Sequence, residues 1–287
     1  MTALTDRNTV KIALGIPTAD TSEDSLIDQL ISECSNLIEE ECGRTFGLNN
    51  WVEILCGNGQ QYLDLRNRPI SLYYWSGSTV AGSEVVHTET AGLVEGMPVV
   101  GDGIPSYAVI SEVNPTSGTI TLSVPATKTQ TVQLYFGLSV WLDEGALFGQ
   151  AVGAFPASTM LTPGIDFALD VDQPDGYTSR SGLIYCNNGP WPMPFTYSPG
   201  RISPDLGPRK GNVLVHYTAG YASVPTDIQL ACNLMIARVR KLSIYGEALT
   251  AERDEVFSYN LKSAAKLGLI SPEVSSRLAR YRNVGVG

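Results

Sequence analysis

Histidine and cysteine are scarce in this chain of 287 residues, and those present form no known site pattern. There are two histidines, His87 and His216, and five cysteines without a C-x-x-C pair. Neither histidine has a second metal-ligating residue at a useful spacing, which argues against a zinc site. The odd number and wide spacing of the cysteines predict reduced packing residues in a protein made in the cytoplasm.

Catalytic signatures are missing too. The patterns G-x-S-x-G and H-E-x-x-H and a phosphate-binding glycine loop do not occur in the sequence. Without a triad or a paired-carboxylate pattern, we expect no catalytic residues, no cofactor, no metal and no enzymatic activity. The stretch Asp170–Gly176 imitates a calcium loop, but Pro174, Asp175 and Ser181 occupy positions where that loop requires other residues. We interpret it as a polar turn between strands.

Long apolar runs are absent. No segment approaches the roughly 18 apolar residues of a membrane span, and Met1–Asn8 lacks the apolar region of a signal peptide. We therefore expect a soluble protein that is made in the cytoplasm and has no membrane partner.

Positive charge is also limited. Charged residues make up 17% of the chain, the net charge is −10 and the pI is about 4.7. Surfaces that grip DNA without sequence preference are normally basic, so the balance argues against such a contact. The same charge balance does not exclude a channel through which DNA slides. Two basic groups, 238–241 and 277–282, are candidates for DNA contact, although solvated helix faces or acidic protein partners are commoner.

The charge is unevenly distributed along the chain. Residues 1–56 carry three basic and ten acidic residues, a net charge of −7, whereas residues 226–287 carry nine and six, a net charge of +3. Copies with an acidic start and a basic end can pair head to tail, and such contacts close into rings when the rotation allows it. Ordinary surface charge is the alternative interpretation.

Helical periodicity is clear at both ends of the chain. Residues 20–42 place apolar side chains on one face, which predicts a long amphipathic helix. Its acidic end, Glu39, Glu40 and Glu41, opposes the helix dipole, which suggests that a partner compensates. Pro225 suits the start of a second helix that ends at Gly246, and we expect further helices over 251–267 and from Ser271. The predicted core residues of the second helix are Ile228, Ala231, Met235 and Val239.

Between these helices the sequence predicts strands. The runs 51–56 and 60–65 flank Gly57–Asn58–Gly59 as an expected hairpin, and 69–75, 177–188 and 212–218 are expected to be strands. Residues 77–137 alternate short apolar runs with turns, which predicts a small inserted all-β module. The glycine-rich run 145–160 and the proline-rich run 189–210 are expected to be loops.

Several short motifs occur in a characteristic order. Leu14–Gly15–Ile16 precedes the first helix, and Cys42–Phe46 (C-G-R-T-F) ends it. The segment Tyr217–Tyr221 reads Y-T-A-G-Y and is followed by Val224 and Pro225. This order resembles the phage head–tail connector family, also called adaptor or head-completion proteins. The resemblance covers about residues 9–75 and 165–284 and also rests on these residues: Gly57, Gly59, Leu63, Leu65, Pro69, Ile70, Ala231 and 271–282.

The predicted fold class is α+β: a helical connector core, with a long N-terminal helix and C-terminal helices, carrying β hairpins and an inserted all-β module. The resemblance implies the helical core, and the inserted module exceeds the compact core of the family. The domains would be 1–76 with 138–287 as a discontinuous core, and 77–137 as the insertion. The resemblance also implies a structural virion protein of the phage neck that forms a homo-oligomeric ring, commonly of twelve copies. The ring would bind the portal protein and a tail or neck protein, and DNA would pass through it as cargo.

The predicted portal or inter-subunit contacts are at the charged ends of the chain. They are Arg277, Arg280, Tyr281, Arg282, Glu39, Glu40 and Glu41. The basic stretch 277–282 is expected to meet either acidic residues of the portal or the acidic helix of another copy. Two rivals remain open: a tail or host receptor-binding protein that uses the β module, and a cell-wall hydrolase.

Overall fold

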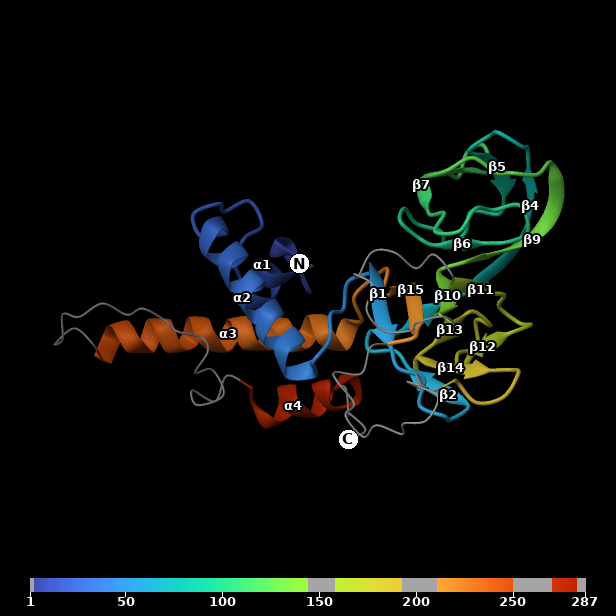
Figure 1. The fold of residues 1–287 in the computed structure, drawn as a ribbon. Coiled ribbons are helices and arrows are strands. Elements are labelled where there is room, and N and C mark those ends of the chain that lie inside the picture. Colours follow the sequence, from blue (N-terminus) through green and yellow to red (C-terminus); the bar gives the residue numbers. More distant parts are fainter. Residues whose placement is uncertain (1–2, 144–157, 193–210, 250–269, 283–287) are drawn as a thin grey trace. The chain divides into compact units, whose positions relative to one another are not determined.

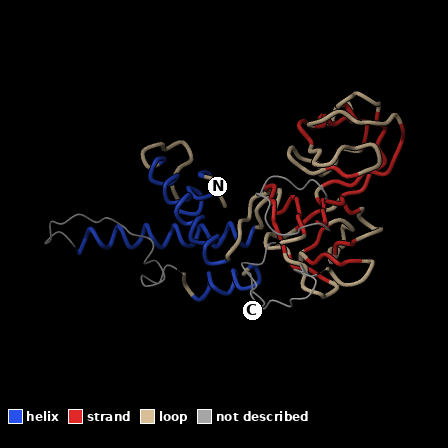
Figure 2. The backbone as a smooth tube through the Cα atoms, viewed as in Figure 1, coloured by secondary structure: helices blue, strands red, loops and turns tan. Residues whose placement is uncertain are grey.

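The computed structural model describes residues 3–143, 158–192, 211–249 and 270–282. The chain divides into two compact units, and each is described by itself. The helical unit comprises Met1–Gly47 and Tyr221–Gly287, and the β unit comprises Leu48–Gly220. Figure 1 shows the helices in one unit and the strands in the other, and Figure 2 shows the same division by secondary structure.

The helical unit is built from α1 (Arg7–Leu14), α2 (Asp24–Cys42), α3 (Thr226–Leu249), α4 (Pro272–Leu278) and the short 3₁₀ helix η2 (Ala279–Tyr281). The termini of α1 and α2 follow ordinary capping rules. Asp6 caps α1 through its carboxylate, and Gly15 and Gly43 end α1 and α2 in the left-handed conformation that glycine adopts without strain.

The apolar faces of these helices form one core. It contains 18 buried residues, from Leu4 near the start of the chain to Tyr281 near its end. The spacing of Ile27, Ile31, Cys34 and Ile38 places them on one side of α2, where they meet the stripe from α3. Burying such faces, at about 25 cal/mol per Å² of apolar surface, is what holds short helices together.

The first sheet of the β unit has six strands. They are β1 (Asn49–Leu55), β3 (Ile70–Ser71), β10 (Leu138–Asp143), β11 (Ser158–Leu161), β13 (Thr178–Ser179) and β15 (Val213–Ala219). Their order is β11-β10-β15-β3-β13, and β1 also pairs with β15. All these pairings are antiparallel.

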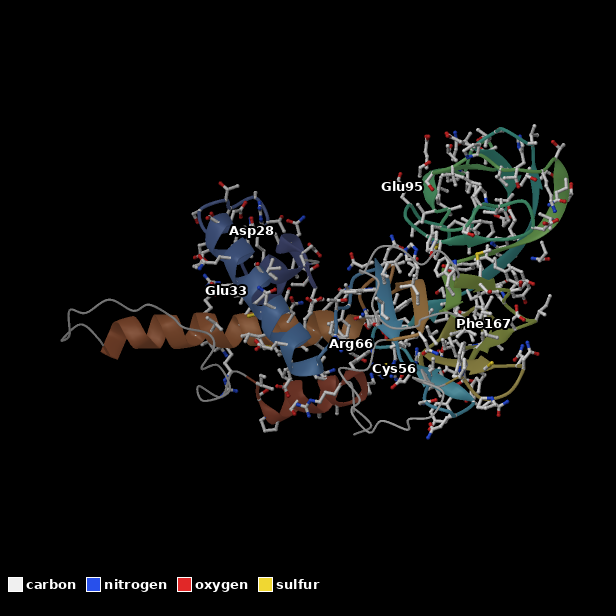
Figure 3. All side chains as sticks on the ribbon, in the orientation of Figure 1. Asp28, Glu33, Cys56, Arg66, Glu95 and Phe167 are labelled. Atoms are coloured by element: carbon white, nitrogen blue, oxygen red, sulfur yellow. The ribbon has the colours of Figure 1, made fainter. Side chains whose placement is uncertain are left out.

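The second sheet contains β2 (Tyr62–Asp64), β12 (Phe167–Leu169) and β14 (Leu183–Cys186), in the order β12-β14-β2. It shares an apolar core with the first sheet, in which Phe167, Trp191 and Tyr217 are fully buried. Figure 3 labels Phe167 within this group of strands. The indole N–H of Trp191 donates to the backbone oxygen of Ile184 at 3.2 Å, so this buried polar group has a partner.

The third sheet is formed by six strands in the order β6-β9-β4-β5-β8-β7. They are β4 (Tyr73–Thr79), β5 (Val85–Thr88), β6 (Val99–Val100), β7 (Ile110–Asn114), β8 (Thr119–Leu122) and β9 (Gln130–Phe136). Hydrogen bonds between 96–99 and 108–110 join the two ends of the sheet, which therefore closes into a small barrel. This barrel has its own core, which includes Leu134 and Phe136.

The predicted fold class is wrong. The chain is mostly β, with three antiparallel sheets, and the helices do not form a central core that carries hairpins. The helical periodicity of 20–42 identified α2 correctly, but the prediction took too little account of the short strands within 138–186. The predicted domain boundaries at residues 77 and 137 stay a prediction.

Three local expectations need correction. The strands β1 and β2 do not form a hairpin, because β1 pairs with β15 and β2 with β14. The region 138–165 holds β10 and β11, so the predicted glycine loop 145–160 is wrong for residues 158–160. Helix α3 continues past Gly246 to Leu249. The rest of the glycine loop, residues 193–210 of the proline-rich run and the helix expected over 251–267 lie outside the described residues.

Candidate interaction sites

Three segments that carry the family resemblance meet in one aromatic cluster of the helical unit. Phe46 is fully buried, stacks on Tyr221 at 6.4 Å between ring centroids and meets Tyr281 edge-on at 5.7 Å. The guanidinium of Arg44 lies over the rings of Phe46 and Tyr221, at 5.2 and 5.7 Å. Such contacts stabilise a fold by about 0.5–1 kcal/mol or more each when partly buried. The cluster therefore ties the end of α2 to the start and the end of the C-terminal helices.

The predicted basic residues are paired within their own chain. Arg282 forms an ion pair with Glu41, and Arg280 forms one with Asp227. Arg277 lies 3.3 Å from Glu273 and 3.9 Å from Asp227. Each of these side chains is partly exposed, so each pair contributes at most about 1 kcal/mol. The structure thus brings Arg282 and Glu41 together in one copy, and a contact between copies stays a prediction.

The other two acids at the end of α2 differ in their surroundings. A carboxylate oxygen of Glu39 accepts the backbone N–H of Phe46 at 3.1 Å, which helps to fix the turn after the helix. Glu40 is exposed. Glu40 is therefore the member of this group best placed to meet another molecule.

The predicted core residues of α3 lie in the interior of the helical unit. Ile228, Ala231 and Met235 are fully buried, and Val239 is nearly so. Beside them, the side-chain oxygen of Asn233 accepts from the hydroxyl of Thr5 at 2.9 Å. These residues are thus packing residues of the unit and do not face a ligand.

Sequence reasoning missed a buried cation, Lys11. Its side chain is 2% exposed and forms an ion pair with Asp24. Its ammonium group also donates to the backbone oxygens of Asp20, at 2.6 Å, and Thr18, at 3.3 Å. Three acceptors thus surround the charge and hold the turn between α1 and α2. An amphipathic pattern marks a lysine on a helix as a surface residue, so no sequence signal pointed to it.

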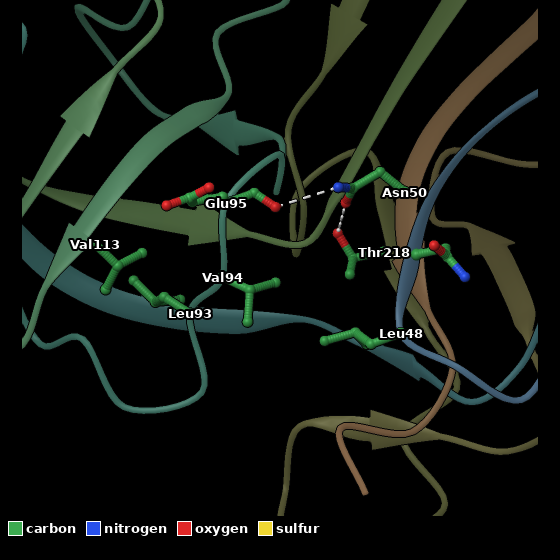
Figure 4. Close-up of a pocket in the computed structure, with 8 residues that line it drawn as sticks. Leu48, Asn50, Leu93, Val94, Glu95, Val113 and Thr218 are labelled. Atoms are coloured by element: carbon green, nitrogen blue, oxygen red, sulfur yellow. Dashed lines mark hydrogen bonds between the residues drawn. The ribbon is translucent and has the colours of Figure 1, made fainter. Parts of the chain in front are cut away.

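A shallow groove of about 440 Å³ lies in the β unit. Figure 4 shows Leu48 and Asn50 on one side and Leu93, Val94 and Glu95 on the other. The amide group of Asn50 donates to the backbone oxygen of Glu95 at 3.2 Å, and its oxygen accepts from the hydroxyl of Thr218 at 2.6 Å. The bond to Glu95 joins the first sheet to a loop of the barrel, and the bond to Thr218 lies within the sheet.

A second contact joins the barrel to the first sheet. The ring of Tyr107 stacks on Trp141 with 4.5 Å between ring centroids. The backbone of Tyr107 has a φ of 64°, in the left-handed region that bulky residues rarely adopt. Trp141 is only 2% exposed.

The acidic turn 170–176 uses its carboxylates to order its own backbone. Asp172 accepts from the N–H groups of Arg180 and Ser181, and Asp175 accepts from those of Tyr177 and Thr178. Burial alone would raise the pKa of both carboxyls, but these bonds outweigh it and hold both pKa values below the usual range. This is how a polar turn behaves.

The described ranges contain no group of three or more histidine, cysteine, aspartate or glutamate residues that could hold a metal ion. His87 lies on β5 and His216 on β15. Burial lowers the pKa of His216. Sequence reasoning missed a polar group inside the β unit: the hydroxyl of Tyr217 donates to Glu53 at 2.5 Å and accepts from the backbone N–H of Asn67 at 3.1 Å.

All five cysteines are free. Cys34, Cys42 and Cys232 are buried in the helical core, and Cys56 and Cys186 are half-buried. Burial raises the pKa of the Cys42 and Cys232 thiols to about 11. These two are therefore packing groups at neutral pH.

Among the helices that the structure describes, none is long and apolar enough to cross a membrane.

Comparisons with known proteins give little. No protein-family model matches the sequence, and no curated protein matches it. Among solved structures, the chain is similar to a chain of the "Neck of empty GTA particle computed with C6 symmetry". The TM-score is 0.36 at 12% sequence identity, over 97% of this chain and 89% of that chain. A likeness at this level does not establish a common fold.

Proposed function

We propose that this chain is a structural protein of a tailed-phage particle. In its finer form, the proposal is a head–tail adaptor: a ring in the neck of the virion that binds the portal on one side and the tail on the other. The observation that carries it is the aromatic cluster of the helical unit. The motifs that resemble the connector family, around Phe46, Tyr221 and Tyr281, are distant in sequence but pack together.

This convergence supports the proposal because it explains why the motifs occur together. Arg44 and Phe46 close the end of α2, Tyr221 leads into α3, and Tyr281 follows α4. A substitution in one motif would disturb the packing of the others. These three motifs thus meet in one structural unit, as expected if this part of the resemblance reflects a shared helical unit.

In the proposed mechanism the chain acts mechanically and has no catalytic role. The helical unit docks on the portal, and the β unit joins neighbouring subunits and the tail. DNA passes through the ring as cargo during ejection. The net charge of −10 limits sticking of DNA to the wall by like-charge repulsion.

Mixing the purified chain with the portal complex tests this proposal, and Glu40→Lys probes the docking face. Glu40 is exposed, whereas Glu39 and Glu41 bind groups of their own chain. We expect the native chain to form a ring on the portal under the electron microscope. The variant should bind at least tenfold more weakly, with a changed dependence on salt.

Glu84→Lys is the matched control, since Glu84 is also exposed but lies in the barrel. It changes the net charge by the same amount and should leave portal binding unchanged. A native chain that ignores the portal would contradict the adaptor proposal. If both variants bind as the native chain does, the end of α2 is not the docking face.

The closed barrel of the third sheet favours one alternative, a tail or host receptor-binding protein. It has its own core and exposes Val80 and Val85, which are 53% and 43% exposed. Binding of the full chain to host cells would support this alternative, particularly if Val80→Lys abolished it.

A further inference from the structure

Strand β1 is a long edge strand without the usual protection against pairing. It pairs with β15 along its whole length, and no other strand in the described ranges pairs with its opposite side. Its seven residues include no proline and no lysine, its one charged side chain, Glu53, is bound by Tyr217 of the same chain, and its register shows no bulge. Natural edge strands commonly carry such a feature, because an open edge invites a further strand. The open side of β1 is therefore a candidate interface.

The backbone groups of Asn50, Val52 and Ile54 face this open side. The N–H of Thr218 on β15 donates to the backbone oxygen of Gly137, on the β10 side, at 2.8 Å. Successive residues of a strand direct their hydrogen-bonding groups to opposite sides, so the odd-numbered residues of β15 bond to β1. Their partners in β1 are also odd-numbered. The even-numbered residues of β1 consequently direct N–H and C=O groups outward.

An apolar row crosses one face of the first sheet and reaches both outer strands. Met160 on β11 lies beside Trp141 on β10, Trp141 lies beside Leu214 on β15, and Leu214 lies beside Ile54 on β1. Trp141 and Leu214 are 2% and 7% exposed, whereas Ile54 is 45% exposed and its neighbour Val52 is 63% exposed. The row is covered in its middle and open at the edge that β1 forms.

We propose that β1 of one copy pairs with β11 of the next copy, so that the first sheet continues from subunit to subunit. This inference rests on the proposed ring. Neighbours among β1, β15, β10 and β11 all pair antiparallel, so β1 and β11 run in opposite directions. A rotation about an axis along the strands then places β11 of the next copy antiparallel to β1, which is the more stable kind of ladder.

The same arrangement continues the apolar row. Ile54 of one copy meets Met160 of the next, and both side chains leave water. The contact uses a different surface on each copy, so it is head to tail, the kind of contact that closes into a ring when the rotation allows it. The interface therefore needs no partner other than this chain.

Charge on the open edge should block the contact. We expect the double variant Val52→Lys/Ile54→Lys to keep its circular dichroism spectrum and to lose ring formation on the portal complex, with at least a tenfold weaker assembly. The matched control is Val80→Lys/Val85→Lys, which places the same charges on similarly exposed valines of the barrel. The control should assemble as the native chain does.

Crosslinking tests the pairing directly and does not depend on the lysine variants. The pair Ile54→Cys and Met160→Cys, made in a chain that also carries Cys56→Ser and Cys186→Ser, should give a ladder of covalent multimers after oxidation on the portal. Either new cysteine alone should not give this ladder.

Three outcomes would overturn the inference, and they separate it from the proposed function. The native chain could form rings without the crosslinked ladder, and the lysine variant could assemble as well. That result would be consistent with the adaptor proposal and would exclude this interface. A lysine variant that loses portal binding, while native rings on the portal give no crosslinked ladder, would show that β1 meets the portal and not the next copy. A native chain that forms no ring with the portal would contradict the proposed function and this contact with it.

Discussion

At the scale of single residues, the clearest structural dependence is that of Lys11. Its buried ammonium group meets Asp24 and two backbone oxygens in the turn between α1 and α2. Lys11→Met leaves those acceptors without a donor, and a broken buried pair is costly. Because Asp24 keeps Arg7 as a partner, we expect the free energy of unfolding to fall by about 2 kcal/mol.

Arg7→Gln provides the comparison for this substitution. Arg7 is 43% exposed and binds Asp24 and Asp28 at the surface, so its loss should cost at most about 1 kcal/mol. Urea unfolding of both variants measures the difference. Equal losses would show that the burial of Lys11 does not matter to the fold.

At the scale of elements, the barrel is joined to the rest of the β unit by two adjacent strands. Tyr73 at the start of β4 pairs with Phe136 at the end of β9, so the chain enters and leaves the barrel at one place. We expect a chain in which a short glycine-serine link replaces residues 73–136 to fold. It should lose the ring contact between Tyr107 and Trp141 and the hydrogen bond from Asn50 to Glu95, each worth about 1 kcal/mol. Circular dichroism and thermal unfolding would measure this, and an insoluble product would contradict it.

Elements whose signal is local could be predicted from the sequence. The spacing of Ile27, Ile31 and Ile38 is enough to place α2, and alternation over 85–88 placed β5. Pairing could not be predicted in this way. The turn Gly57–Asn58–Gly59 favours a hairpin, yet β1 pairs with a strand more than 150 residues away. No local pattern contains that choice, because it depends on which faces the core buries.

The candidate site was predictable to a similar degree. The uneven charge marked both Glu41 and Arg282, and the structure brings them together within one chain. The charge distribution did not indicate Asp227, the partner of Arg280. An acidic residue in the first turn of a helix is already explained by the helix dipole. The unpaired side of β1 could not be predicted either, because it follows from the order of the strands in the sheet.

At the scale of the whole molecule, the proposed function makes this chain one part of a larger assembly. The helical unit holds the aromatic cluster where three of the connector-like motifs meet, and the β unit holds the open edge of β1. A ring uses both, since one surface must meet the portal and another must meet the next copy. Neither surface requires a bound ligand or a catalytic group.

The most direct test of the central claim is the mass of the purified chain in solution, alone and mixed with portal complex, by light scattering. If the chain is a head–tail adaptor, we expect copies of this 30.8 kDa chain to join the portal and to raise its mass by a defined multiple of the mass of one chain. A chain whose mass is the same with and without portal would contradict the adaptor proposal and favour a tail or receptor-binding protein.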